Sequence, residues 1–310
     1  MLEGCAGKGL ALSSWAAHVA KLTIDIRRFR VLPGRQLALE KHDPADTYPF
    51  DIKTGTRRLL KKRARRLYEL TELLYAQNRW AVLFIFQALD GAGKDSAIKH
   101  VMRGLDPKST QVYSFKTPST EELKHDFMWR CMKSLPERGR IGIFNRSYYE
   151  EVLISRVHPE LLENQRLPKP LVNGHLWQDR FEDITAIERF LARNGTVIRK
   201  IFLNVSKTEQ RRRFLERLHD PAKKWKFSVN DVNERLRWTE YMSAYEKAMR
   251  ATSTVDAPWY IVPADHKWFT RLAVAAIVID TLESLKLHIP LLSRREYRAL
   301  RHAKRRLRAR

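Results

Sequence analysis

The stretch FQALDGAGKDS at residues 86–96 carries the residues that most plainly suggest chemistry. It follows an apolar run and precedes a predicted helix, a context in which backbone N–H groups at the helix start can hold a phosphate. The usual phosphate-loop pattern begins with Gly and ends with Gly-Lys followed by Ser or Thr. Here Ala88 occupies the first position and Asp95 the last, whereas Gly93 and Lys94 stand where the pattern requires them. The loop is predicted to bind phosphate, with Lys94 reaching the transferred group.

The Ser or Thr that is absent from this loop normally binds Mg²⁺ in phosphate-loop enzymes. Mg²⁺ prefers hard oxygen ligands, usually one or two carboxylates together with phosphate oxygens and water. Asp90 leaves the end of the apolar run and is best placed by sequence to replace the missing hydroxyl. We therefore expect Asp90 to bind Mg²⁺, for which Mn²⁺ could substitute. The remaining loop residues expected to contact phosphate or nucleotide are Gly91, Ala92, Gly93, Asp95 and Ser96.

A second candidate constellation is IGIFNRSYYEEVL at residues 141–153. Its apolar start predicts a strand that ends at Asn145, where the Walker B strand of such enzymes typically ends in Asp. Asn145 would offer a neutral oxygen to the metal, and the planar Arg146 guanidinium suits phosphate. Glu150 and Glu151 follow on the next predicted helical turn. The alternative interpretation is a strand-to-helix cap that takes no part in chemistry.

The charge balance restricts the class of partner. Fifty-nine Lys and Arg against 35 Asp and Glu give a formal net charge of +24 and a pI near 10.2. Such a composition favours a polyanion, whether nucleic acid, an anionic membrane or another phosphate polymer. The two cysteines, Cys5 and Cys131, do not make a disulfide framework, and no apolar run approaches the ~18 residues of a spanning helix. We expect a cytoplasmic protein with reduced thiols and no membrane partner.

Apolar runs of strand length alternate with helical periodicity along most of the chain. This alternation predicts a parallel sheet with helices on both faces. The predicted strands cover residues 80–89, 111–118, 140–145, 196–205 and 259–265. The predicted helices cover residues 56–80, 94–105, 120–136, 207–221, 230–253 and 268–285.

Five blocks of sequence, in order, together resemble the polyphosphate kinase 2 family. They are DGAGKD, SFKTPSTEELKHDFMWR, IGIFNRSYYEEVLISRVHP, DPAKKWKFS and TSTVDAPWYIVPADHKW, and the resemblance extends from about residue 42 to about residue 272. Several separate blocks in order are far more specific than a lone phosphate loop. With Asn145 at the Walker B position, the chain resembles the class III branch of the family, which acts on both nucleoside mono- and diphosphates. Other branches more often have Asp at this position.

This resemblance implies a three-layer α/β/α P-loop kinase fold with a parallel central sheet and a helical lid, similar to thymidylate kinase. It implies reversible, Mg²⁺-dependent phosphoryl transfer between inorganic polyphosphate and AMP or ADP, with GMP and GDP left open, in a homodimer or homotetramer. The kinase domain is expected over residues 51–290, with a lid near 207–235. An N-terminal extension over 1–50 precedes it, and a basic tail over 291–310 follows. The tail could extend a polyphosphate track, aid assembly or bind nothing specific.

The resemblance also implies roles for individual residues. Asp90 and Asn145 would place the metal, and Lys94 and Arg146 would hold phosphates. Three consecutive lid arginines begin at Arg211 and point in different directions around a helix, so at least one should face the cleft. The other contacts expected with phosphates or the acceptor come from Glu150 (with Glu151 as the alternative), Lys116, Arg211, Arg212, Lys223 and Lys226.

Three other interpretations remain open. An ATP-dependent nucleoside monophosphate kinase would have the same fold, but one ATP does not need a strongly cationic protein. A nucleic-acid-binding P-loop ATPase would grip backbone phosphates, yet the chain shows neither an acidic Walker B pair after a strand nor a second motor domain, which makes a nucleic-acid partner a weak expectation. The third interpretation is a non-enzymatic polyanion-binding protein. Under it, Ala88, Asp95 and Asn145 would mark phosphate-binding motifs that have lost their catalytic activity.

Overall fold

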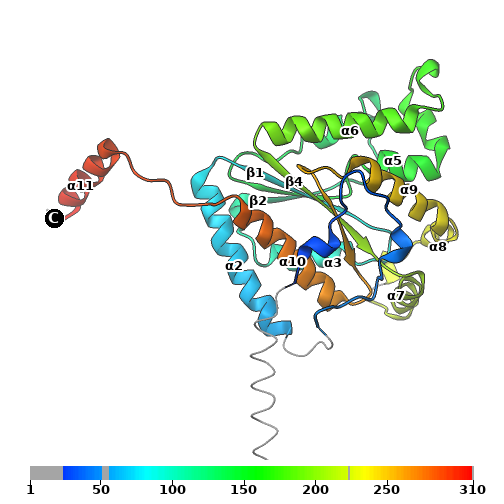
Figure 1. Cartoon of the computed structure of the whole chain (residues 1–310), viewed down its shortest axis with the longest axis horizontal. Helices are drawn as coiled ribbons and strands as arrows, with labels where there is room; N and C mark the ends of the chain where they lie inside the picture. The colour runs from blue at the N-terminus through cyan, green and yellow to red at the C-terminus, as the bar shows by residue number, and fades with distance from the viewer. Residues whose placement is uncertain (1–23, 51–55, 223, 309–310) are drawn as a thin grey trace, which may run out of the picture.

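A computed structural model describes residues 24–50, 56–222 and 224–308 of the chain. Its centre is a five-stranded sheet with the strand order β2-β3-β1-β4-β5 (Figure 1). All four pairs of neighbouring strands are parallel. The alternation of strands and helices therefore predicted the parallel sheet correctly. The strands are β1 (Ala81–Gln87), β2 (Thr110–Ser114), β3 (Ile141–Asn145), β4 (Thr196–Asn204) and β5 (Trp259–Pro263).

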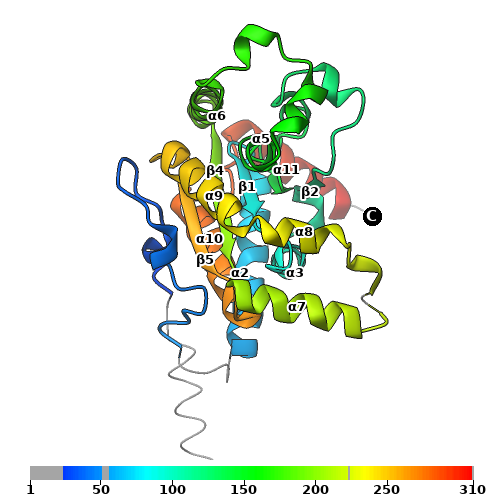
Figure 2. The ribbon, with the colours of Figure 1, turned by 90° about the vertical axis from the view of Figure 1, so that its right-hand side faces the viewer.

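Helices cover both faces of this sheet, which makes three layers (Figures 1 and 2). One face carries α2 (Thr56–Gln77), α3 (Lys94–Met102) and α10 (Lys267–Ser284), whose buried residues share one core with alternate residues of β1. The other carries α4 (Trp129–Met132), α5 (Glu150–Val157), α6 (Leu176–Arg193) and α9 (Trp238–Thr252). Every residue of β1 is buried, as a central parallel strand requires.

The remaining helices lie at the periphery. The lid region holds α7 (Lys207–His219), the 3₁₀ turn η7 (Lys224–Lys226) and α8 (Asn230–Leu236). The chain ends in α11 (Arg294–Arg308), which projects from the body in Figure 1. Within the described residues, no helix is long and apolar enough to cross a membrane. Short 3₁₀ turns complete the elements: Ile26–Phe29, Leu39–Lys41, Pro107–Ser109, Glu122–Lys124, Pro159–Gln165 and Lys169–Leu171.

The described part of the N-terminal extension packs on the edge of the sheet. The backbone N–H of Val31 donates to the Trp259 carbonyl at 2.9 Å, and Arg30 forms an antiparallel bridge with Tyr260. Phe29 and Phe50 are buried and meet the ring of Phe269 edge-on. Residues 24–50 therefore share one core with the sheet and its helices and cover the outer edge of β5, which would otherwise expose unpaired backbone groups.

Two predicted helices were wrong in their extent. The helix expected over 120–136 is a 3₁₀ turn at Glu122–Lys124 followed by the short α4. The carboxylate of Asp126 accepts from the Met128 N–H at 2.9 Å, so this residue starts a new helix where the pattern suggested a continuous one. The helix expected over 230–253 is divided at Arg237, which ends α8 and precedes α9.

Helix α6 was not assigned from the sequence. Its buried positions include Leu176, Phe181 and Ile184 at helical spacing, but also Arg180 and Glu188. Buried charges at core positions interrupt the apolar stripe by which a helix is recognised.

Candidate active site

The two motifs meet at the carboxyl ends of β1 and β3, in a cleft of about 790 Å³ that we call the phosphate cleft. From β1 the chain builds one side of the sheet with β2 and β3, and then crosses to the other side with β4 and β5. In open α/β sheets, ligands bind at the point where the strand order reverses. The fold therefore places the loop after β1 at this crossing point.

The phosphate loop has the backbone that its glycines predict. Gly91 and Gly93 have φ angles of 85° and 95°, a region that suits glycine. A Cβ on Gly91 would lie 2.9 Å from the Phe214 ring and 3.0 Å from the Gln210 side chain, so helix α7 leaves no room for one. Helix α3 begins directly after the loop, at Lys94, and its first N–H groups lie beside the cleft.

Lys94 lies among three carboxylates of the site. Burial and the nearby Arg146 lower the pKa of its ammonium group, whereas Glu150, Asp90 and Asp95 raise it. The net result is a lowered pKa, so the surrounding carboxylates do not offset the desolvation of this charge. A phosphate group bound in the cleft would act in the same direction as these carboxylates and raise the pKa of Lys94.

Arg146 joins the two motifs. Its guanidinium donates to Asp90 Oδ1 at 3.2 Å and to Glu150 Oε2 at 3.3 Å, and both carboxylates raise its pKa. The residue has a φ of 65°, which is uncommon for a side chain other than glycine. Glu150 is buried, and burial raises its pKa even though Arg146 and Lys94 act in the opposite direction. The structure thus places a fixed cation between two acids at the head of the cleft.

Asn145 ties the end of β3 to the start of α3. Its side-chain amide donates to Asp95 Oδ1 at 2.9 Å and to Ser114 Oγ at 3.3 Å. Asp90, Asp95 and Asn145 all line the phosphate cleft and offer hard oxygen atoms. Within the described ranges, no three His, Cys, Asp or Glu side chains form a cluster that could hold a metal. The donor set fits a cation such as Mg²⁺ that takes few protein ligands and completes its shell with phosphate and water.

Comparison with known proteins agrees with this geometry. The model of the family "Polyphosphate kinase 2 (PPK2)" matches residues 51–289. This chain belongs to the polyphosphate kinase 2 family. The expected P-loop kinase fold is confirmed with it, since polyphosphate kinase 2 from Arthrobacter aurescens superimposes with a TM-score of 0.80 at 39% identity, over 88% of this chain and 94% of that one.

Two curated relatives of this polyphosphate kinase 2 cover nearly the whole chain. The ADP-polyphosphate phosphotransferase of Rhodopseudomonas palustris is 50% identical over 271 residues, which are 87% of this chain and 93% of the relative. The AMP/ADP-polyphosphate phosphotransferase of Meiothermus ruber is 42% identical over 266 residues, 86% of this chain and 96% of the relative. The names of these relatives differ in the acceptor that they state.

A second cavity of about 460 Å³, here called the lid pocket, opens on the other side of Arg146. It shares Leu89, Asp90 and Arg146 with the phosphate cleft, whereas Glu150 lines the lid pocket and not the cleft, and helix α8 forms part of its wall. Tyr241 and Tyr245 supply aromatic surface to this pocket. The candidate site of this polyphosphate kinase 2 therefore consists of two cavities that meet at Arg146 and Asp90.

The other residues predicted for the site lie in different surroundings. Lys116 and Ser96 line the phosphate cleft, and the Arg271 guanidinium donates to Ser96 Oγ at 3.0 Å. Ala92 is buried under the loop. Glu151 is also buried, away from the phosphate cleft, and accepts hydrogen bonds from Ser155 and Gln165. Glu151 thus anchors α5 to its neighbours.

The lid arginines divide into different roles. Arg213 is buried, and its guanidinium donates to the carbonyls of Gly91, Ala92, Ala264 and Asp265 at 2.6–3.1 Å. Arg211 and Arg212 are exposed and do not line the phosphate cleft, and Arg212 pairs with Glu209 at 2.7 Å. Lys223 lies outside the described residues, and Lys226 is described only by its place in η7. The cleft cations that sequence reasoning did not single out are Arg213, Arg217 and Lys267.

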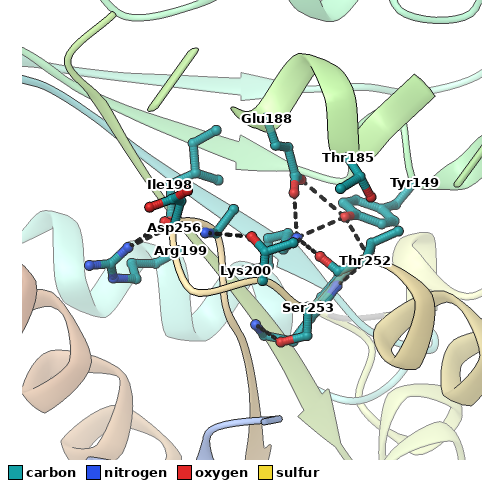
Figure 3. Close-up of polar contacts among 12 residues, drawn as sticks. Tyr149, Thr185, Glu188, Ile198, Arg199, Lys200, Thr252, Ser253 and Asp256 are labelled. Atoms are coloured by element: carbon teal, nitrogen blue, oxygen red, sulfur yellow. Dashed lines mark hydrogen bonds and ion pairs between the residues drawn. The ribbon is translucent and has the colours of Figure 1, made fainter. Parts of the chain in front are cut away.

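A buried network holds the segment that carries Arg146 and Glu150 (Figure 3). Lys200 of β4 is fully buried and lies 2.5 Å from Glu188 of α6. The Lys200 ammonium also donates to the Tyr149 hydroxyl at 3.0 Å and to the Thr252 carbonyl at 2.7 Å. Tyr148 and Tyr149 both donate to Glu188. Because Tyr149 precedes Glu150, this network fixes the turn from which the catalytic candidates project.

Proposed function

We propose that this protein transfers phosphoryl groups between inorganic polyphosphate and nucleoside mono- and diphosphates. The observation that carries the proposal is the pair of cavities that meet at Asp90 and Arg146, with Glu150 on the wall of the lid pocket. One cavity holds the phosphate loop, as a phosphate chain requires. The other has aromatic and polar walls that suit a nucleotide. The family to which the chain belongs, and the names of both relatives, support the same reaction.

The proposed chemistry needs positioning and charge neutralisation rather than a covalent intermediate. Lys94 and the N–H groups of the phosphate loop hold oxygens of the phosphoryl group that moves. Arg146 lies between the two cavities, where negative charge develops during transfer. Glu150, which holds Arg146 in place, lies on the acceptor side. Burial raises the pKa of the Glu150 carboxyl, and Arg146 and Lys94 act against this shift.

We further propose that Asp90 and Asn145, with Asp95 beside them, hold Mg²⁺ through oxygen atoms and water. When bound, the cation would neutralise charge on the reacting phosphates. Mn²⁺ has the same preference for oxygen ligands and should substitute for Mg²⁺.

The acceptor range is the finer part of the proposal. We propose that both AMP and ADP are accepted, because Asn145 resembles the branch with this range and the Meiothermus ruber relative is named for both. The Rhodopseudomonas palustris relative is named for ADP alone. The cytoplasm as location and a homodimer or homotetramer as assembly belong to the same proposal, and light scattering on the purified protein tests the assembly.

The deciding experiment is a transfer assay. Purified protein is incubated with long-chain polyphosphate, Mg²⁺ and each of AMP, ADP, GMP and GDP, and the products are separated by ion-exchange chromatography. A parallel reaction with ATP and AMP but no polyphosphate serves as the control. We expect polyphosphate-dependent ADP and ATP from AMP. Turnover of ADP alone would refute the acceptor range, and turnover only with ATP as donor would refute the polyphosphate reaction.

A further inference from the structure

A second basic cavity lies outside the active site, between helices α2 and α3. It has a volume of about 720 Å³, and we call it the α2–α3 groove. Arg57, Arg58 and Lys61 line it from α2, and His100 and Arg103 line it from α3, above an apolar floor of Leu60 and Ala64. Every polar side chain that lines this groove is therefore basic.

Among the described residues, no ion-pair partner lies beside the arginines and the lysine of this groove. Within the described ranges, no carboxylate lies within 4.0 Å of Arg57, Arg58, Lys61 or Arg103, whereas two turns further along α2 Arg66 pairs with Glu69 and Glu283. Basic residues in the first turns of a helix oppose its dipole, and like charges one turn apart repel each other. The first turn of α2 contains no acidic residue that would relieve this repulsion. An anion from outside the protein would relieve it.

The groove is joined to the phosphate cleft by helix α3. This helix begins in the cleft at Lys94, and Arg103 in the groove follows nine residues later, about 14 Å along the helix axis. Arg271 lies between the cleft and the groove. Its guanidinium donates to Ser96 in the cleft, and burial, Arg271 and Arg103 lower the pKa of His100 in the groove. Arg271 thus places a basic side chain between the residues of the cleft and those of the groove.

We propose that the α2–α3 groove binds the distal phosphates of the polyphosphate chain whose end reacts in the phosphate cleft. The inference rests on the proposed function, because it assumes that a polyphosphate end lies at Lys94. A polymer with no base or sugar is held mainly through its charge, and every polar side chain of this groove is basic. None of the residues that line it is Phe, Tyr or Trp, so the groove lacks the large aromatic side chains that single-stranded nucleic-acid sites use to stack successive bases.

The test compares two triple variants that remove the same charge. The groove variant carries Arg58→Gln, Lys61→Gln and Arg103→Gln, three exposed positions. The control carries Arg189→Gln, Arg193→Gln and Lys247→Gln, three exposed positions on the opposite layer. Both are assayed with ADP and either long-chain polyphosphate or tetrapolyphosphate, which is too short to reach from the cleft into the groove. Circular dichroism and thermal unfolding check that each variant is folded.

We expect the groove variant to raise KM for long-chain polyphosphate about tenfold, since three contacts each contribute a factor of about two. The KM for tetrapolyphosphate and the kcat with either donor should stay within twofold of wild type. Equal increases for both chain lengths, or an equal increase in the control variant, would overturn the proposal. Absence of any polyphosphate-dependent transfer by the wild type would instead refute the proposed function.

A competition measurement completes the test. Single-stranded RNA is added to the wild-type reaction and to the groove variant with long-chain polyphosphate. We expect RNA to inhibit both proteins weakly and to the same extent. Strong inhibition of the wild type that is lost in the groove variant would assign the groove to nucleic acid and contradict the proposal. If the triple variant does not fold, the single variants Arg58→Gln and Lys61→Gln allow the same comparison of chain lengths.

Discussion

Arg146 lines both the phosphate cleft and the lid pocket. Its guanidinium is a rigid fork with donors on separate nitrogens, one for Asp90 and one for Glu150. A lysine ammonium in the same position is a single point charge on a flexible stem, and it cannot span both carboxylates in a fixed geometry.

We therefore expect Arg146→Lys to lower kcat about 100-fold, in line with the loss of one preorganised donor to a developing charge. The KM values for polyphosphate and for nucleotide should change much less, because the net charge of the site is kept. Steady-state kinetics on the purified variant, with thermal unfolding as the check on folding, measure both effects. A kcat within threefold of wild type would show that a simple cation is sufficient.

Asp90 and Lys94 allow a second test at this scale. We expect Asp90→Ala and Lys94→Ala each to reduce transfer more than 100-fold while the protein remains folded, because each removes a charge that faces the phosphates. Single-turnover assays with ADP and polyphosphate measure the loss. Substantial activity in either variant would contradict the site assignment.

Individual site residues could be predicted from the sequence where they belong to one short motif. The loop glycines, Lys94 and Arg146 belong to short motifs that follow the ends of β1 and β3. The motifs themselves therefore indicate that these residues lie close together. Arg213 could not be distinguished from the two arginines before it, because the choice depends on where α7 packs against the phosphate loop. The burial of Glu151 depends on Gln165 and Arg180, which are distant in sequence, and no local pattern reports such contacts.

At the scale of elements, the sheet and α6 are joined by the charge pair of Lys200 and Glu188. Burial lowers the pKa of Lys200 and raises that of Glu188, so each charge depends on the other and on the tyrosine hydroxyls. We expect Lys200→Met to lower the free energy of unfolding by about 3–5 kcal/mol, since it leaves a buried carboxylate without its counter-charge. Urea unfolding measures the change.

A double variant controls for the loss of packing. Lys200→Met with Glu188→Leu removes both charges, and it should recover most of the stability because paired buried charges can be replaced by apolar groups at little cost. Equal destabilisation in the single and the double variant would mean that side-chain shape, and not the buried charge, sets the effect.

A polar contact between lid helix α8 and the end of α5 should respond to pH. His158 Nε2 lies 2.9 Å from Glu234 of the lid, and Nδ1 lies 3.0 Å from Glu160. Burial and Arg237 lower the pKa of His158, but the two glutamates outweigh them and the net pKa is raised. The folded protein therefore keeps this proton to a higher pH than an unfolded histidine, whose pKa is about 6.5.

The stabilising contribution is thus complete below about pH 6.5 and is lost as the pH rises through the raised pKa. We expect His158→Gln to be cleaved by trypsin in α8 several times faster than wild type near pH 6.5, and at nearly the same rate near pH 9. The ratio of the two proteins' cleavage rates cancels the pH dependence of the protease. A ratio that is constant with pH would exclude a role for this proton.

The elements themselves were predictable where one physical signal dominated. The apolar run of β1 and the nearly all-apolar pattern of α10 fix strand and helix unambiguously. Residues 120–136 have helical composition, but Asp126 competes for the backbone N–H groups, and the outcome depends on packing around Arg130. The α6 pattern was obscured because the buried carboxylate of Glu188 pairs with Lys200 of β4 and accepts from Tyr148 and Tyr149, all of which lie outside α6.

For the whole molecule, the net charge of +24 predicts a strong dependence on salt. Added salt screens exposed charges over a Debye length of about 10 Å at ~0.1 M. We expect KM for long-chain polyphosphate to rise at least about tenfold between ~50 and ~200 mM salt, because each charge contact releases counterions. The KM for ADP, which makes fewer such contacts, should rise less than about threefold. A similar salt dependence of KM for polyphosphate and for ADP would show that the excess positive charge does not contribute to polyphosphate binding.

The position of α11 has a practical consequence. Every described residue of this helix is exposed, and in Figure 1 it lies on the opposite side of the body from α7 and α8. A fusion partner or a solid support attached at the C-terminus would therefore stand clear of the cleft and the lid. The enzyme should work when immobilised through this end, with its entrance open to long chains in the surrounding solution.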